Sequence, residues 1–248
     1  MAEKEFDITT PDGVMPSFAA WPDPGGAHGE GPYPVIVMYM DAPGIREELR
    51  DFARRIAAQG YYAVLPDLYY RLGLLRFNLA ERTEKMGEMI FAAWHSLTNA
   101  GVASDTGAIL SALGDDAAAS DGPMGCVGYC MSGAFITTVA GRYPDRFAAN
   151  VSLYGVWIVT EHDDSPHLLA PRIEGEMYYA FAERDHWVPD SVIPDLTAAL
   201  DAAGVPHEIE TFPDTDHGFA FPQRDIYHEA SAEIVWGKMF DLYARVLG

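Results

Sequence analysis

Short, unbroken apolar runs that alternate with helical patterns constrain the fold of this chain most strongly. Residues 35–40 are apolar throughout, and residues 45–59 then repeat apolar side chains at helical spacing and end at Gly60. A fully apolar run followed by a helix is typical of a parallel strand that is buried on both faces of a sheet. Residues 61–65 form the next such run, so the pattern predicts an α/β fold.

The same alternation continues to the C-terminus, after a predicted β-hairpin whose strands, 6–9 and 15–20, flank a Pro-Asp-Gly turn. Residues 69–120 show helical patterns that are interrupted at 99–101 and at Gly114. No break in composition and no internal repeat divides the chain. Residues 1–248 are therefore predicted to form a single doubly wound α/β domain, with a mostly parallel sheet and helices on both faces. The further strands are expected at 124–128, 148–153, 175–182 and 207–211, and the further helices at 134–140, 192–203 and 227–247.

Composition excludes several classes of function. The formal net charge is −21, which is unsuited to binding a phosphate backbone, so no nucleic-acid partner is expected. Hydrophobic residues make up 49% of the chain, enough for a large core, yet no stretch has the length and apolarity of a membrane span. The N-terminus lacks the basic and apolar blocks of a signal peptide. We expect a cytoplasmic monomer or homodimer with no membrane partner.

The two cysteines, Cys126 and Cys130, are predicted to be free thiols. On one strand their separation is about 13 Å, too far for a disulfide. Cys130 lies in Gly128-Tyr129-Cys130-Met131-Ser132-Gly133, between a predicted strand and a predicted helix. Small residues two positions to either side permit the strained turn of a nucleophile elbow. A buried core cysteine is the alternative for Cys130, and it is the role expected of Cys126.

A nucleophilic thiol needs a base, and position selects His217 among the eight histidines. His217 follows the strand predicted at 207–211, and loops at the carboxyl ends of parallel strands are where such folds assemble their sites. An acid that fixes the imidazole is expected at Asp185, after the strand predicted at 175–182. Glu183, Asp190 and Asp214 are the alternatives for this acid.

Three motifs in this order resemble the dienelactone hydrolase family. They are the Gly128–Gly133 elbow, Ala182-Glu-Arg-Asp-His-Trp-Val-Pro189 and His217-Gly-Phe-Ala-Phe-Pro222. The resemblance covers most of the chain, from about residue 35 to the last helix. It implies an α/β-hydrolase fold without a metal or other cofactor. It also implies that Cys130, His217 and Asp185 form a catalytic triad that hydrolyses a small carboxylic ester or lactone.

The chain departs from the family pattern at two places. Family lactonases carry a glutamate after the first core strand that contacts the resting thiol, and the nearest acid here is Asp41. An alignment shifted by one residue places Met40 at that position instead. Asp41 is either that contact or a loop residue bonded to local backbone. Those lactonases also hold the substrate carboxylate with an arginine four residues after the histidine, where this chain has Phe221. We therefore expect a more apolar substrate than a dienelactone anion.

The expected reaction is attack of the Cys130 thiolate on the carbonyl, followed by hydrolysis of an acyl-thioenzyme. The backbone N–H groups of Met131 and Ala42 are predicted to bind the oxyanion. A metal site at His162-Asp163-Asp164 with His167 is a minor alternative, as are thiol redox chemistry at Cys130 and a binding protein that lost turnover. The candidates for the wall of the substrate pocket are Tyr69, Tyr154, Trp187, Phe219, Phe221 and Arg71.

Overall fold

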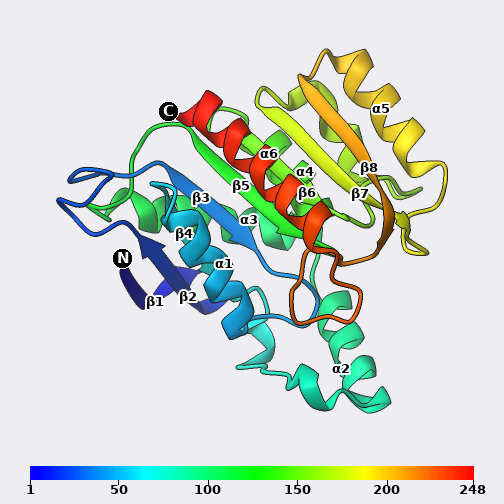
Figure 1. Cartoon of the computed structure of the whole chain (residues 1–248), viewed down its shortest axis with the longest axis horizontal. Helices are drawn as coiled ribbons and strands as arrows, with labels where there is room; N and C mark the ends of the chain where they lie inside the picture. Colours follow the sequence, from blue (N-terminus) through cyan, green and yellow to red (C-terminus); the bar gives the residue numbers. More distant parts are fainter. The chain divides into compact units, whose positions relative to one another are not determined.

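The computed structural model describes all residues, 1–248 (Figure 1). The backbone divides into two compact units, Met1–Gly122 and Pro123–Gly248. They are called the N-terminal unit and the C-terminal unit below. The prediction of a single domain stays a prediction, whereas the two cysteines are free thiols as predicted.

Four strands form the sheet of the N-terminal unit, in the order β1-β2-β4-β3. The predicted hairpin is confirmed, and it is longer than expected because pairing extends from Ala2 opposite Trp21 to the turn at Gly13. β2 runs antiparallel to β4, and β3 runs parallel to β4. The strands are β1 (Ala2–Thr10), β2 (Gly13–Trp21), β3 (Val35–Tyr39) and β4 (Tyr62–Pro66).

Three α-helices complete this unit, and the last one corrects the prediction. The interruption expected at 99–101 lies earlier, at residues 96–98 between two helices, because Asn99 begins the second helix and Gly101 lies in its first turn. The Thr98 hydroxyl accepts a hydrogen bond from the Gly101 N–H, which is the N-cap interaction that starts a helix. The helices are α1 (Glu47–Ala57), α2 (Glu84–His95) and α3 (Asn99–Gly114), with 3₁₀ turns at Tyr70–Leu72 and Leu79–Glu81.

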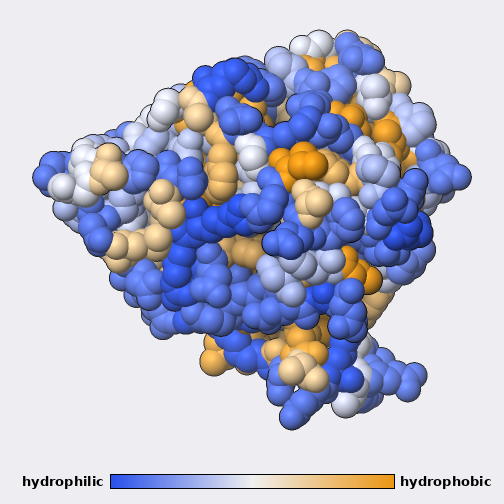
Figure 2. Space-filling view, in the orientation of Figure 1, coloured by the Kyte–Doolittle hydropathy of each residue, from blue (hydrophilic) through white to orange (hydrophobic).

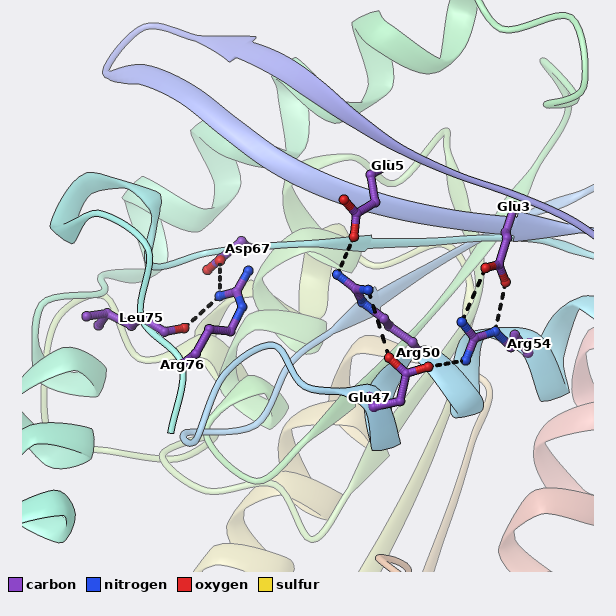
Figure 3. A network of polar contacts seen from close by, with 8 residues as sticks. All are labelled: Glu3, Glu5, Glu47, Arg50, Arg54, Asp67, Leu75 and Arg76. Carbon is purple, nitrogen blue, oxygen red and sulfur yellow. Dashed lines mark hydrogen bonds and ion pairs between the residues drawn. The ribbon is translucent and has the colours of Figure 1, made fainter. Parts of the chain in front are cut away.

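Helix α1 packs against β2 and β4 through a stripe of Leu49, Phe52 and Ile56, all of which are buried. Charged residues tie its outer face to the hairpin (Figure 3). Arg54 pairs with Glu3 of β1, and Arg50 pairs with Glu5 of the same strand. These pairs are partly exposed, so we attribute the docking of α1 mainly to the burial of its apolar stripe.

The C-terminal unit contains a sheet of four parallel strands in the order β5-β6-β7-β8. Helix α6 lies in front of this sheet in Figure 1 and α4 lies behind it, so the predicted covering of both faces holds within this unit. The strands are β5 (Met124–Tyr129), β6 (Phe147–Leu153), β7 (Glu176–Arg184) and β8 (His207–Asp216). The helices are α4 (Ser132–Arg142), α5 (Val192–Ala203) and α6 (Glu229–Leu247), with a 3₁₀ segment at Pro166–Arg172.

Strand β8 is longer than the predicted 207–211. It stays paired with β7 as far as Asp216, which lies opposite Arg184, and these two side chains form an ion pair of 2.9 Å. Polar residues at the end of β8 hid this extension from a reading based on apolar runs. His217 is therefore the first residue after the strand.

The surface agrees with the composition. Figure 2 shows a face on which hydrophilic residues predominate and apolar residues form separate patches. None of the helices combines the length and apolarity that crossing a membrane requires.

Candidate active site

Cys130 occupies the turn between β5 and α4 with a φ of 56°. A positive φ is strained for a residue that carries a side chain, and such strain is characteristic of nucleophile elbows. Both the N–H and the carbonyl group of Cys130 are hydrogen-bonded. The Cys130 N–H donates to the Leu153 carbonyl at 3.1 Å, and the Cys130 carbonyl accepts from the N–H groups of Gly133 and Val156. Cys130 is partly exposed, as a nucleophilic residue must be.

The small neighbours of Cys130 are required by close packing. A Cβ atom on Gly128 would lie 2.7 Å from Ile136 Cγ1 and 2.8 Å from the Ser132 carbonyl oxygen. A Cβ on Gly133 would lie 2.2 Å from the Gly155 Cα. Ser132 itself is fully buried at the start of α4. The sequence pattern that predicted the elbow thus corresponds to positions at which a larger side chain does not fit.

Asp185 and His217 meet because the strands that precede them are paired. Arg184 on β7 lies opposite Asp216 on β8, and each is followed by the site residue. Asp185 Oδ2 lies 2.7 Å from His217 Nδ1, so Nδ1 is the nitrogen that donates. The other oxygen, Oδ1, accepts from the Trp187 N–H at 3.0 Å. The carboxylate is therefore fixed in orientation, and its side chain is only 2% exposed.

This environment keeps His217 protonated at neutral pH. Burial alone lowers the pKa of the imidazole, but the hydrogen bond to Asp185 and the neighbouring Cys130 sulfur together raise it from 6.5 to about 9. Nε2 is buried and makes no well-aligned hydrogen bond. A protonated imidazole beside the sulfur stabilises a thiolate, which is the reactive form of cysteine.

Cys126 has the structural role that was predicted for it. It is fully buried, its Sγ lies 3.1 Å from Asn150 Oδ1, and burial raises the pKa of its thiol well above the ordinary value. A thiol of this kind is inert. Any thiol chemistry of the native protein therefore takes place at Cys130.

Three aromatic residues that were predicted to line a substrate pocket form a buried cluster next to His217 instead. Tyr154, Phe219 and Phe221 are fully buried. The Tyr154 ring lies 5.4 Å from the His217 ring and 5.5 Å from Phe219, edge-on in both cases, and it also contacts Phe221. Because they bury one another, these rings present no surface to a substrate in this structure.

Phe221 has a charged neighbour. The Arg224 guanidinium lies 4.3 Å from the centre of the Phe221 ring. Arg224 also lies next to Gly218, where a Cβ would come within 2.2 Å of its Nη1. A positive charge therefore stands close to the segment that carries His217, although the position four residues after the histidine is apolar.

Four of the predicted site residues, Asp41, Ala42, Tyr69 and Arg71, belong to the N-terminal unit. Asp41 is fully buried and forms an ion pair of 2.5 Å with Arg46, which also pairs with Glu48 at 2.8 Å. The carboxylate of Asp41 is therefore held by a guanidinium, and the alternative of bonding to local backbone N–H groups stays a prediction. Its contact with the thiol stays a prediction.

Ala42 is braced by Tyr69, whose hydroxyl donates to the Ala42 carbonyl at 2.8 Å. Tyr69 is buried, so it supports the backbone of the predicted oxyanion donor and offers little surface for substrate. Arg71 forms two hydrogen bonds of 2.8 Å with the fully buried Asp105. Its charge is therefore already matched by a carboxylate, which disfavours the predicted contact with a substrate anion.

Each unit contains a hollow. One, of about 290 Å³, is bordered by Asp185, with Val188 and Asp190 among its other residues, so it adjoins the triad acid. Trp187, the remaining predicted pocket residue, is partly exposed beside His186 in the same loop. The other hollow, of about 520 Å³, lies in the N-terminal unit near Arg76 and Asp67, which form an ion pair (Figure 3).

The model of the dienelactone hydrolase family matches residues 24–247. The chain belongs to the dienelactone hydrolase family. The resemblance recognised from the three motifs is thereby confirmed, and the protein is a hydrolase by family.

Named relatives agree with this assignment. The carboxymethylenebutenolidase of Pseudomonas putida is 28% identical over 221 residues, which cover 88% of this chain and 89% of that protein. A Klebsiella pneumoniae structure described as a "Putative Dienelactone Hydrolase" has a TM-score of 0.85 and 26% identity, with 98% of each chain covered. The dienelactone hydrolase-like promiscuous phosphotriesterase P91, 19% identical, shares the fold with a TM-score of 0.80. The predicted α/β-hydrolase fold class is confirmed.

The sequence did not predict the pairing of Arg46 with Asp41 or the contact of Tyr154 with His217. Arg46 was missed because a lone arginine before a helix resembles a solvated residue, and only its packing shows that it neutralises Asp41. Tyr154 was considered only as a pocket residue. The signal that could have identified its other role is its place directly after β6, followed by Gly155.

Proposed function

We propose that this protein hydrolyses a carboxylic ester or lactone through Cys130, His217 and Asp185. The observation that carries the proposal is the arrangement in one unit of a strained, partly exposed cysteine and an imidazole held by a buried carboxylate. Family membership supports the same reaction class.

In the first half of the reaction the Cys130 thiolate attacks the carbonyl carbon and forms a tetrahedral oxyanion. The oxyanion collapses, the bond to the leaving oxygen breaks, and the alkoxide takes the proton carried by His217. The products of this half are an acyl-thioenzyme and an alcohol, or the ring-opened hydroxyl group of a lactone. His217 is then neutral.

In the second half a water molecule attacks the thioester and His217 accepts its proton. Acylation removes the negative charge of the sulfur, which is one of the groups that raise the pKa of His217. The imidazole consequently becomes a neutral base when a base is needed. Collapse of the second tetrahedral species releases the carboxylic acid, and Cys130 and His217 return to their starting forms.

Stabilisation of the oxyanion is assigned to backbone N–H groups. Met131 directly follows the nucleophile at the N-terminus of α4, where the helix dipole favours negative charge. Ala42 is proposed as the second donor, supported by the brace from Tyr69. One donor of this kind contributes about 3 kcal/mol of transition-state stabilisation.

The substrate is proposed to be a neutral ester or lactone, because Phe221 occupies the place of the substrate-binding arginine and the chain is strongly acidic. A neutral ester and an analogue of equal length that ends in a carboxylate would test this. The neutral ester should have the higher kcat/KM. Preference for the anion, lost in Arg224→Met, would instead assign a carboxylate-binding role to Arg224.

The reaction class is tested with a panel of p-nitrophenyl esters and lactones. Wild-type protein should turn over at least one of them, and iodoacetamide, Cys130→Ala and His217→Ala should each abolish that turnover. Activity that survives in Cys130→Ala would contradict the mechanism. A lack of turnover on every ester, with Cys130 oxidised rapidly by peroxide, would favour thiol redox chemistry.

A further inference from the structure

Tyr154 stands out because it is strained, buried and next to His217. It follows the last residue of β6 and has a φ of 40°, a conformation that residues with side chains rarely adopt. Its N–H donates to the Ala180 carbonyl of β7 at 2.6 Å. Strain of this kind persists only where the surrounding structure holds it, and it is concentrated at functional sites.

The backbone on both sides of Tyr154 is bonded to the nucleophile. The preceding residue, Leu153, accepts from the Cys130 N–H, and Val156 donates to the Cys130 carbonyl. Between them, Gly155 packs so closely on Gly133 that a Cβ on Gly155 would lie 2.7 Å from the Gly133 Cα. Residues 153–156 therefore hold the elbow in place through two hydrogen bonds and one close backbone contact. The turn at Tyr154 allows the chain to make these interactions.

The side chain of Tyr154 contacts the histidine. Its ring centre lies 5.4 Å from that of His217, with an angle of 67° between the planes. Phe219 and Phe221 pack on the same tyrosine ring and prevent it from turning away. Edge-to-face contacts at this distance are attractive, and a protonated imidazole gains additionally from a nearby aromatic ring.

We propose that Tyr154 is a positioning residue that connects the two halves of the triad, with its backbone neighbours holding Cys130 and its ring holding the imidazolium of His217. The proposal rests on the triad proposed above. The ring, not the hydroxyl, carries the effect. Besides Tyr154, the groups that interact with this imidazole are Asp185 and Cys130. Asp216 precedes His217 and pairs with Arg184, and Arg224 lies beside Gly218, which follows His217.

The proposal is tested by the rate at which iodoacetamide alkylates Cys130 between pH 6 and pH 10, a readout that requires no turnover. An aromatic contact of this type changes an equilibrium by roughly 2- to 10-fold. Tyr154→Leu should slow alkylation at pH 6.5 by about that factor, because less thiolate is stabilised. Near pH 10 its rate should approach that of the wild type, since ordinary cysteine thiols are ionised at that pH without a neighbouring imidazolium. Tyr154→Phe should match the wild type throughout.

Tyr179→Leu is the matched control, because Tyr179 is fully buried in the same unit and stacks on Phe181. It should lower the denaturation midpoint without changing the pH dependence of alkylation. If Tyr154→Leu does not fold, Tyr154→Met replaces it, since methionine fills irregular spaces. Equal rates for wild type and variant at every pH, or equal slowing at every pH, would overturn the proposal. Altered alkylation in a protein with no esterase activity would support Tyr154 while contradicting the proposed hydrolysis.

Discussion

Asp185→Asn tests the hydrogen bond on which the proposed chemistry depends. The wild-type carboxylate is buried and lies 2.7 Å from His217 Nδ1. Its partners raise the pKa of His217 from 6.5 to about 9, which corresponds to roughly 3 kcal/mol of preference for the imidazolium. The hydrogen bond to Asp185 is the largest single cause that raises this pKa, and the interactions with the Cys130 sulfur come next. We therefore expect kcat/KM to fall between about 10-fold and 100-fold, since roughly 1.4 kcal/mol corresponds to a factor of ten.

The same substitution predicts a shift in pH dependence. Protonated His217 donates to the leaving alkoxide, so activity on an alkyl ester should be retained below about pH 9 and lost above it in the wild type. Removing the carboxylate charge lowers the pKa of the imidazole, which moves this loss to lower pH. The measurement is kcat/KM against pH with an alkyl ester, because p-nitrophenolate leaves without protonation.

Asp216→Asn serves as the control. Asp216 immediately precedes the histidine, but it is exposed and pairs with Arg184 instead of the imidazole. This substitution should change neither kcat/KM nor the pH above which activity is lost. Suppose that Asp185→Asn loses activity at the same high pH as the wild type and that its kcat/KM stays within twofold of the wild-type value. This result would refute the assignment of Asp185 as the acid of the triad.

Two further predictions concern the stability of the fold. Gly133→Ala places a Cβ 2.2 Å from the Gly155 Cα and should lower the free energy of unfolding by about 1–3 kcal/mol, whereas Gly87→Ala, in an open position of α2, should raise it by about 0.5–1 kcal/mol. Urea denaturation of both variants checks the pair, and equal effects would contradict the packing argument. Arg71→Met leaves the Asp105 carboxylate buried without its guanidinium and should cost about 3 kcal/mol in the same assay. A loss below about 0.5 kcal/mol would show that this pair does not stabilise the unit.

The sequence predicted the elements that carry the site because their signals are local. The buried strands are continuous apolar runs, and the small residues around Cys130 mark a turn in which side chains do not fit. Asp185 and His217 each follow a predicted strand, which favoured them as acid and base, although Glu183, Asp190 and Asp214 stayed open as the acid until the pairing of β7 with β8 was known. The structure shows these two side chains in contact.

What the sequence could not supply depends on contacts between distant segments. The burial of Tyr154 and Phe221 follows from the packing of separate segments. Aromatic content alone therefore suggested that they line a substrate pocket, whereas in the structure they are buried against each other. The sequence made Arg71 a candidate for binding a substrate anion. In the structure it forms an ion pair with Asp105 of α3. The extension of β8 to Asp216 depends on pairing with β7, which outweighs the polar character of its last residues.

Trapping the acyl-enzyme tests the central claim most directly. Wild-type protein is mixed with excess p-nitrophenyl acetate, quenched in acid within the first turnover, digested, and analysed by mass spectrometry beside His217→Ala and Cys130→Ala. The account predicts one acetyl group on the peptide that contains Cys130 in the wild type, with none on Cys126, and a burst of p-nitrophenol of equal stoichiometry. Turnover without acetylation of Cys130, or with the acetyl group on another residue, would contradict it.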